Sequence, residues 1–256
     1  MLRFISLVHV QAQMQLRANA ARTYLSYAWW LLEPLFYVGL FYLIFELLLL
    51  RGTPGFFYFL IVGKISFLWV SKSLGQGAGS IEGGRGLIGQ TYMPMLMFPY
   101  VSIFETCYKQ TVVFLMLIAV MLLGYGSNVN DSWWWLAPVI LVNLLFIISL
   151  VLPFAWLVAV IPDVKMLLPI ITIFLMFTSG IFFDVRELEP DVMELVLTYN
   201  PLAFILDAYR QILMRAQVPE VEHLLRLGGV CITVIGMWHI IYGRSQYFLA
   251  KKVLHS

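Results

Sequence analysis

Six long apolar runs, each separated from the next by a more polar segment, constrain this chain more than any other feature. The shortest has 18 residues, and a helix of 18 to 20 residues rises about 30 Å, which is the thickness of the hydrocarbon core of a bilayer. The runs cover residues 29–50, 56–74, 99–123, 133–160, 166–183 and 224–242. The sequence therefore predicts an all-α membrane protein with six transmembrane helices in a single membrane domain, residues 1–256.

The composition supports this prediction. Of the residues, 61% are hydrophobic and only 12% are charged, whereas a soluble domain has about 25% charged residues. Lipid must cover the excess apolar surface. The net charge of +2 gives no indication of a nucleic-acid partner. Cys107 and Cys231 both lie in apolar stretches, so we expect neither a disulfide framework nor a metal site from them.

The charges at both ends of the chain predict its orientation. In residues 1–27, apolar side chains recur at helical spacing among arginines and glutamines, which indicates an amphipathic helix at the membrane surface. No acidic residue precedes Glu33, and no cleavage site follows, so we expect a retained N-terminus in the cytoplasm. Six spans return the chain to the starting side, and the tail 243–256 is basic. Both termini are therefore predicted to be cytoplasmic.

The segment 184–223 between the fifth and sixth runs differs from the other connections. It holds eight acidic residues and three arginines, yet apolar residues recur in it at helical spacing. Asn200 and Pro201 together are typical of a helix start, with asparagine as N-cap and proline at the first helical position. We expect two short amphipathic helices on the outer side, able to dip into the membrane and close a pore.

Residues 75–89 hold seven of the eighteen glycines. Their spacing resembles that of a phosphate-binding P-loop, but Arg85 and Gly86 stand where a P-loop has its lysine and its serine or threonine. We therefore do not expect nucleotide binding. A flexible connector or, preferably, a docking loop for another protein is the better interpretation.

Charged residues within the apolar runs are expensive in lipid and are functional candidates. Glu105 and Lys109 are four residues apart in the order that favours an ion pair. Lys64 lies eight residues from one end of the second run, about 12 Å deep. It either pairs with Glu46 of the first run or faces a pore and meets an anionic substrate. Glu33 precedes a proline, and a role at the start of the first span is expected for it.

Aromatic residues make up 16% of the chain, and belts at the two membrane interfaces explain most of them. Tyr37 and Tyr42 lie deeper in the first run, and Tyr58 lies near one end of the second. In a pore, such rings would allow sugars to slide by stacking. Contacts with lipid or with neighbouring helices are the alternative for each of them.

No catalytic constellation is evident in the sequence. There is no nucleophile elbow and no metal-ligand pattern, and the four histidines are scattered. Four carboxylates do cluster, at Asp184, Glu187, Glu189 and Asp191, but a helix start or a solvated face explains such a run more simply. We therefore predict a chain that is not an enzyme.

Several blocks of sequence, in this order along the chain, resemble permease subunits of type-2 ABC exporters, in particular those for capsular polysaccharide or lipopolysaccharide O-antigen. Two positions depart from the family's pattern: Ser26, where glycine is common, and Pro162, where an arginine often precedes the aspartate. The blocks are Tyr27-Ala-Trp-Trp-Leu-Leu-Glu-Pro-Leu35, Gly79-Ser-Ile-Glu82, Gly86-Leu-Ile88, Ser179-Gly-Ile-Phe-Phe183, Asn200-Pro-Leu202 and Tyr209-Arg210.

The resemblance implies a permease that exports a lipid-linked polysaccharide across the bacterial inner membrane. It implies a pore formed with a second copy of the chain, and two separate ABC ATPase subunits that supply ATP and Mg²⁺, with no cofactor in this chain. An ABC exporter of a smaller lipid, drug or oligosaccharide is the alternative within the superfamily. A membrane-embedded transferase acting on lipid-linked sugars is the alternative from another class, and only residues 184–191 offer it a cluster of acids.

The resemblance also suggests where each task is performed. Residues 1–27 would be an interface helix, the inner loops 76–92 and 161–165 would couple to the ATPase, and the hairpin 184–216 would be an outer gate. The predicted coupling residues are Glu82, Arg85, Asp163 and Lys165. The predicted gate residues are Asn200, Pro201, Tyr209 and Arg210. The predicted substrate pathway contains Tyr37, Tyr42, Tyr58 and Lys64.

Overall fold

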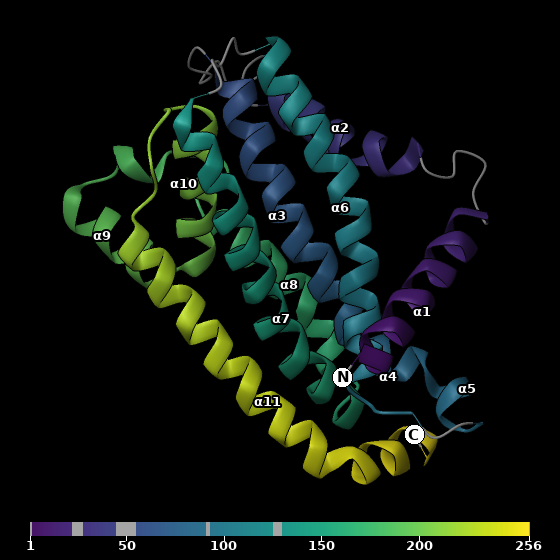
Figure 1. Ribbon diagram of the computed structural model, residues 1–256. Helices are drawn as coiled ribbons and strands as arrows, with labels where there is room; N and C mark the ends of the chain where they lie inside the picture. The colour runs from purple at the N-terminus through teal and green to yellow at the C-terminus, as the bar shows by residue number, and fades with distance from the viewer. Residues whose placement is uncertain (1, 22–27, 45–54, 91–92, 125–129, 256) are drawn as a thin grey trace.

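The computed structural model describes residues 2–21, 28–44, 55–90, 93–124 and 130–255, and within these ranges the chain is helical and contains no strand (Figure 1). The main helices pack side by side as a bundle, with short helices between them at both ends. In chain order the elements are α1 (Leu2–Ala21), α2 (Ala28–Tyr42), α3 (Phe56–Ala78), α4 (Ser80–Gly83), α5 (Arg85–Ile88), α6 (Met97–Gly124), η2 (Asp131–Trp135), α7 (Leu136–Val160), α8 (Val164–Thr178), η3 (Val185–Glu187), α9 (Pro190–Tyr199), α10 (Pro201–Leu213) and α11 (Val221–His255).

Four of the described helical stretches are long and apolar enough to cross a membrane, namely 56–78, 97–124, 131–160 and 221–254. The predicted class of helical membrane protein is therefore confirmed. The predicted first span extends into residues 45–50, which lie outside the described residues. The fifth is shorter than predicted, because α8 has 15 residues and ends at Thr178. Gly180 then adopts a positive φ of 71°, a left-handed conformation that is typical of a helix end.

The centre of the bundle is α3, which contacts α2, α6, α7, α8 and α10. Most of its residues are buried, including the polar side chains of Lys64, Ser66 and Ser73. Gly77 lets α7 approach closely, because a Cβ at this position would overlap the Val151 side chain. Such small residues at helix crossings are typical of packing in membranes, where van der Waals contact holds helices together.

Both chain termini lie at one end of the bundle, which we call the terminal end, and α4 and α5 lie there too (Figure 1). The helices α9 and α10 lie toward the other end, which we call the opposite end. The last helix, α11, has 35 residues and is about 50 Å long, so it exceeds the hydrocarbon thickness. It joins the predicted sixth span and the predicted tail, as far as His255, into one helix that bends near the C-terminus (Figure 1).

The predicted N-terminal helix is present as α1, which lies across α6 (Figure 1). Val8 and Ala12 are buried against Met97 and Val101 of α6. The glycine-rich segment 75–89 is largely helical rather than an open connector, since α3 continues to Ala78 and α4 and α5 follow directly. Burial of Ile81 and Ile88 anchors these two short helices on the core, which makes them a firm surface.

Candidate functional site

At the opposite end, α10 is a buried helix. Every residue from Leu202 to Leu213 is buried, so the predicted water-exposed face is absent, because α3, α7 and α9 all pack against this helix. The predicted cap is confirmed: Asn200 Oδ1 accepts hydrogen bonds from the backbone N–H groups of Leu202 and Ala203. Asn200 Nδ2 also donates to the Thr178 carbonyl at 3.2 Å, and this bond joins α10 to the end of α8. Pro201 occupies the first helical position, as predicted.

Arg210 is the largest fully buried side chain among the described residues. Its guanidinium donates to the carbonyls of Gly180 at 2.6 Å, Ile181 at 3.2 Å and Phe59 at 3.4 Å. It also stacks on the Phe59 ring, 3.5 Å from the ring centroid. The carbonyls that follow α8 would otherwise be orphaned, so Arg210 holds α8, α10 and α3 together. Gly63 makes room for it, because a Cβ there would collide with the guanidinium.

Tyr209 is also fully buried, and its hydroxyl accepts a hydrogen bond from Asn143 Nδ2 of α7 at 3.4 Å. Its ring lies 5.5 Å from that of Phe114 on α6. Sequence reasoning missed Asn143, although an isolated asparagine within the long apolar run 133–160 was a usable signal.

A network of charged side chains surrounds Asp207 at the opposite end. Asp207 accepts from Arg186 Nε at 2.9 Å, from Gln211 at 2.6 Å and from Arg215 at 3.3 Å. Arg215 also pairs with Asp184. The hydrogen bond to Asp207 raises the pKa of Arg186, so this guanidinium stays charged at every accessible pH. The network joins the segment before α9 to α10 and engages Asp184, one of the four clustered carboxylates.

Lys64 lies between α2, α3 and α8 with only 4% of its surface exposed. Its Nζ is 3.3 Å from the Met176 sulfur. The ammonium also lies over three aromatic rings: Tyr37 at 5.0 Å, Phe41 at 5.0 Å and Phe67 at 5.3 Å from the ring centroids. Cation–π attraction and the thioether therefore surround the charge. We call this arrangement the lysine cage. It brings the predicted pathway residues Lys64 and Tyr37 together, whereas Glu46 lies outside the described residues.

The other two predicted pathway tyrosines meet elsewhere. The rings of Tyr42 and Tyr58 both contact Phe57, with centroids 5.5 Å and 5.4 Å away. Tyr58 also lies beside Gly124 at the end of α6, where a Cβ would collide with its hydroxyl. The four predicted pathway residues thus form two groups, one at the lysine cage and one around Phe57.

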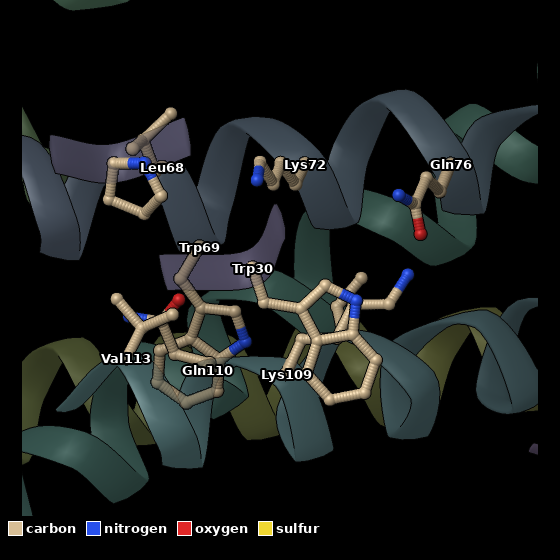
Figure 2. Close-up of a pocket in the computed structure, with 10 residues that line it drawn as sticks. Trp30, Leu68, Trp69, Lys72, Gln76, Lys109, Gln110 and Val113 are labelled. Atoms are coloured by element: carbon tan, nitrogen blue, oxygen red, sulfur yellow. The ribbon is translucent and has the colours of Figure 1, made fainter. Parts of the chain in front are cut away.

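A small pocket of about 30 Å³ lies between α2, α3 and α6 (Figure 2). Lys109 Nζ of α6 lies 6.0 Å from the centroid of the Trp30 ring, and Lys72 of α3 lines the same pocket (Figure 2). The predicted pair is confirmed, because Lys109 Nζ lies 2.7 Å from Glu105. Lys72 makes a second ion pair, with Glu33 at 2.6 Å, which sequence reasoning missed because the two residues lie on different helices.

At the terminal end, two of the four predicted coupling residues meet directly. Lys165 Nζ lies 3.6 Å from Glu82, so the first turn of α8 contacts α4. Arg85 donates to the Leu254 carbonyl at 2.8 Å and thereby caps the last turn of α11. Asp163 is exposed and makes no side-chain capping bond to α8. No described group of three or more His, Cys, Asp or Glu residues is arranged to hold a metal ion.

Comparison with known proteins gives distant relatives that match along most of the chain, although no protein-family model matches. The O-antigen export system permease protein RfbA of Myxococcus xanthus is 24% identical over 242 residues, which cover 94% of this chain and 93% of the relative. An O-antigen export system permease protein RfbA of Klebsiella pneumoniae is 25% identical over 241 residues, which cover 92% and 90%.

The polysialic acid transport protein KpsM of Escherichia coli is 24% identical over 234 residues, which cover 89% of this chain and 85% of the relative. The resemblance predicted from the sequence is therefore confirmed. The chain is a distant homologue of polysaccharide-export permeases over most of its length, and these homologues are transport proteins rather than enzymes.

Proposed function

We propose that this chain is the permease subunit of an ATP-driven exporter that moves a lipid-linked polysaccharide, an O-antigen or a capsule, across the bacterial inner membrane. The observation that carries this function is the similarity to O-antigen and polysialic acid permeases along most of both chains. The helical membrane architecture supports it, since four described helical stretches are long and apolar enough to span a bilayer.

The terminal end is the cytoplasmic end in this proposal, and a separate ABC ATPase docks there. Two observations support this placement. Ile81 packs α4 firmly against the core, and the partly exposed Glu82–Lys165 pair lies beside it. Glu82, Arg85, Asp163 and Lys165 then form the coupling surface. The ATPase subunit binds ATP and Mg²⁺, and this chain transmits the conformational change of the ATPase to the membrane helices.

The pore is shared with a second copy of the chain. Only one residue of α8, Leu168, is buried, and large apolar side chains such as Phe174, 66% exposed, cover the rest of this helix. Neighbouring α2 exposes Phe36 to a similar degree. A face of this kind suits either lipid or another copy. The lysine cage lies between these two helices and α3, so a pore at this face would run beside Lys64 and Tyr37.

The helices α9 and α10 form the outer gate in this proposal. Asn200 and Arg210 both bind carbonyls at the end of α8, so a movement of α8 would be passed directly to α10. Tyr209 would transmit the same movement to α7 through Asn143. The buried hydrogen bonds of Asn200, Tyr209 and Arg210 therefore link the gate helices so that they move as a rigid body.

The purified chain is expected to hydrolyse no ATP by itself, because its glycine-rich segment lacks the lysine and hydroxyl of a P-loop. Affinity purification from the native bacterium in mild detergent should recover it with an ATPase of ordinary P-loop type, and the complex should hydrolyse ATP. Steady ATP hydrolysis by the chain alone, or recovery of the chain without any ATPase, would contradict the proposal.

Exchanging the charges of Glu82 and Lys165 tests the coupling surface. The double variant Glu82→Lys, Lys165→Glu keeps the ion pair, and exposed pairs contribute at most about 1 kcal/mol to stability, so the protein level should not change. The exchange reverses the charge pattern on the surface that contacts the ATPase. Such patterns determine how two proteins align at an interface. Export in cells and glycan-stimulated ATP hydrolysis should therefore fall at least about tenfold.

The matched control is the same exchange in the exposed pair Glu222–Arg226 at the start of α11. The variant Glu222→Arg, Arg226→Glu should export at the wild-type rate. Wild-type export by the Glu82–Lys165 exchange would show that this pair takes no part in coupling.

A further inference from the structure

A second and larger hollow lies near the terminal end, between α1, the α3–α4 junction and α6. Its volume is about 340 Å³, and hydrogen-bonding side chains line much of it. We call it the amide groove, after its polar lining, which consists of Gln11, Gln15, Asn19, Gln76, Ser80, Ser102 and Glu105. The first three follow one another at intervals of four residues, so they form a single stripe along α1. Gln11 is partly buried, whereas Gln15 and Asn19 are exposed along the rim of the groove.

Several hydrogen-bonding groups of the groove have no partner among the described residues, although Gln15 and Gln76 are exposed and open to water. Gln11, Gln15 and Gln76 make no hydrogen bond to any described part of the chain. The hydroxyl oxygen of Ser80 is buried and has no partner among the described residues. Buried polar groups without partners are uncommon, and such a group calls for an explanation.

Glu105 has one engaged carboxylate oxygen. Asn19 donates to Glu105 Oε1 at 2.8 Å and Lys109 donates to the same atom at 2.7 Å. Within the described ranges its other oxygen, Oε2, accepts no hydrogen bond, although the side chain lines the groove. The groove therefore offers one carboxylate acceptor, three amides that both donate and accept, and the hydroxyls of Ser80 and Ser102.

The chemistry of the groove lining indicates which class of ligand the groove binds. Among the described residues that line the groove there is no lysine or arginine, and the one charged side chain is a carboxylate. Lys109 already pairs with this carboxylate, so no described residue lining the groove supplies a free cation to hold a phosphate or another anion. A neutral polyhydroxylated ring suits the lining, because adjacent hydroxyls both donate and accept, as the amides do.

We propose that the amide groove binds a neutral sugar residue of the glycan on the cytoplasmic side, before the chain of sugars enters the pathway. This inference rests on the proposed function. Gln76 lines both the groove and the pocket of Figure 2, so a sugar chain leaving the groove would next meet the Trp30 indole. The ring faces of indoles are suitable surfaces for the apolar faces of sugars.

Site-specific photocrosslinking in the native bacterium tests the proposal, with the cell's own glycan as the probe. A photoreactive amino acid replaces Gln15 in the full transporter, and Gln13 serves as the control, since it lies outside the groove and bonds to His9. Illumination at position 15 should yield a ladder of heavier permease species that stains for oxidised sugar and collapses after mild acid hydrolysis. Position 13 should yield none.

A substitution adds a quantitative test. The double variant Gln11→Ala, Gln15→Ala keeps good helix formers on α1 and removes two hydrogen-bonding groups, so export should fall about tenfold at an unchanged protein level. Gln13→Ala should export normally. Equal crosslinking at positions 13 and 15, a crosslink at 15 to the ATPase instead of glycan, or wild-type export by the double variant would each overturn the proposal. A wild-type chain that exports no glycan would instead contradict the proposed function.

Discussion

Replacing Arg210 by alanine is expected to remove most of the folded protein from the membrane. The change orphans the carbonyls of Gly180 and Ile181 and leaves a cavity where the guanidinium stacked on Phe59. Each orphaned buried carbonyl costs about 1–3 kcal/mol, so the total loss is about 3–5 kcal/mol. The measurement is the amount of monodisperse protein extracted in detergent and its thermal unfolding.

Gly63→Ala provides an independent test of the same contact, because the added Cβ would displace the guanidinium without removing it. We expect a loss of about 1–3 kcal/mol, which is the usual cost of overpacking. In an Arg210→Met background the same glycine change should cost much less, since the two sites are coupled. Gly229→Ala, where a Cβ meets nothing within 4 Å, and Arg226→Ala on the exposed face of α11 are the matched controls. Additive losses would show that Gly63 does not act through Arg210.

Lys64→Met is expected to leave the protein folded and abolish most export. Methionine has a similar length and suits the aromatic rings and the Met176 sulfur around it, so the protein level should stay the same or rise. If the lysine meets an anionic group of the substrate when the pore opens, its loss removes a charge-assisted hydrogen bond of about 1.5–3 kcal/mol. Export in cells should then fall by about tenfold to a hundredfold.

The alternative is a structural partner for Lys64, and Glu46 is the candidate that the sequence offers. In that case Lys64→Met should lower the protein level, and the double variant Glu46→Gln, Lys64→Met should restore both level and export. Normal export by the single variant would contradict both roles.

Local patterns in the sequence predicted the local features of the structure well. The apolar runs gave the positions of α3, α6 and α7, because lipid imposes length and apolarity on each span separately. The asparagine cap at Asn200 and the Glu105–Lys109 pair were also predictable, since both depend on residues within one helical turn or two.

Features that join distant segments were not predictable. The hydrophobic periodicity of α10 indicated an exposed polar face. Arg210 instead bonds to the carbonyls of Gly180 and Phe59, Asp207 pairs with Arg186, and the whole helix is enclosed. For the same reason the aromatic rings and the thioether around Lys64 come from three helices, and no spacing rule connects them. The burial of α4 and the position of the amide stripe of α1 likewise depend on which helices pack against each other.

The most direct test of the central claim is the fate of the glycan after deletion of the gene in the native bacterium. Surface polysaccharide and intracellular lipid-linked polysaccharide are measured in parallel, with and without the gene supplied in trans. A permease predicts that the polysaccharide disappears from the surface, accumulates inside bound to its lipid, and returns to the surface on complementation. An unchanged surface, or the loss of the polysaccharide from both compartments as expected for a transferase, would contradict the account.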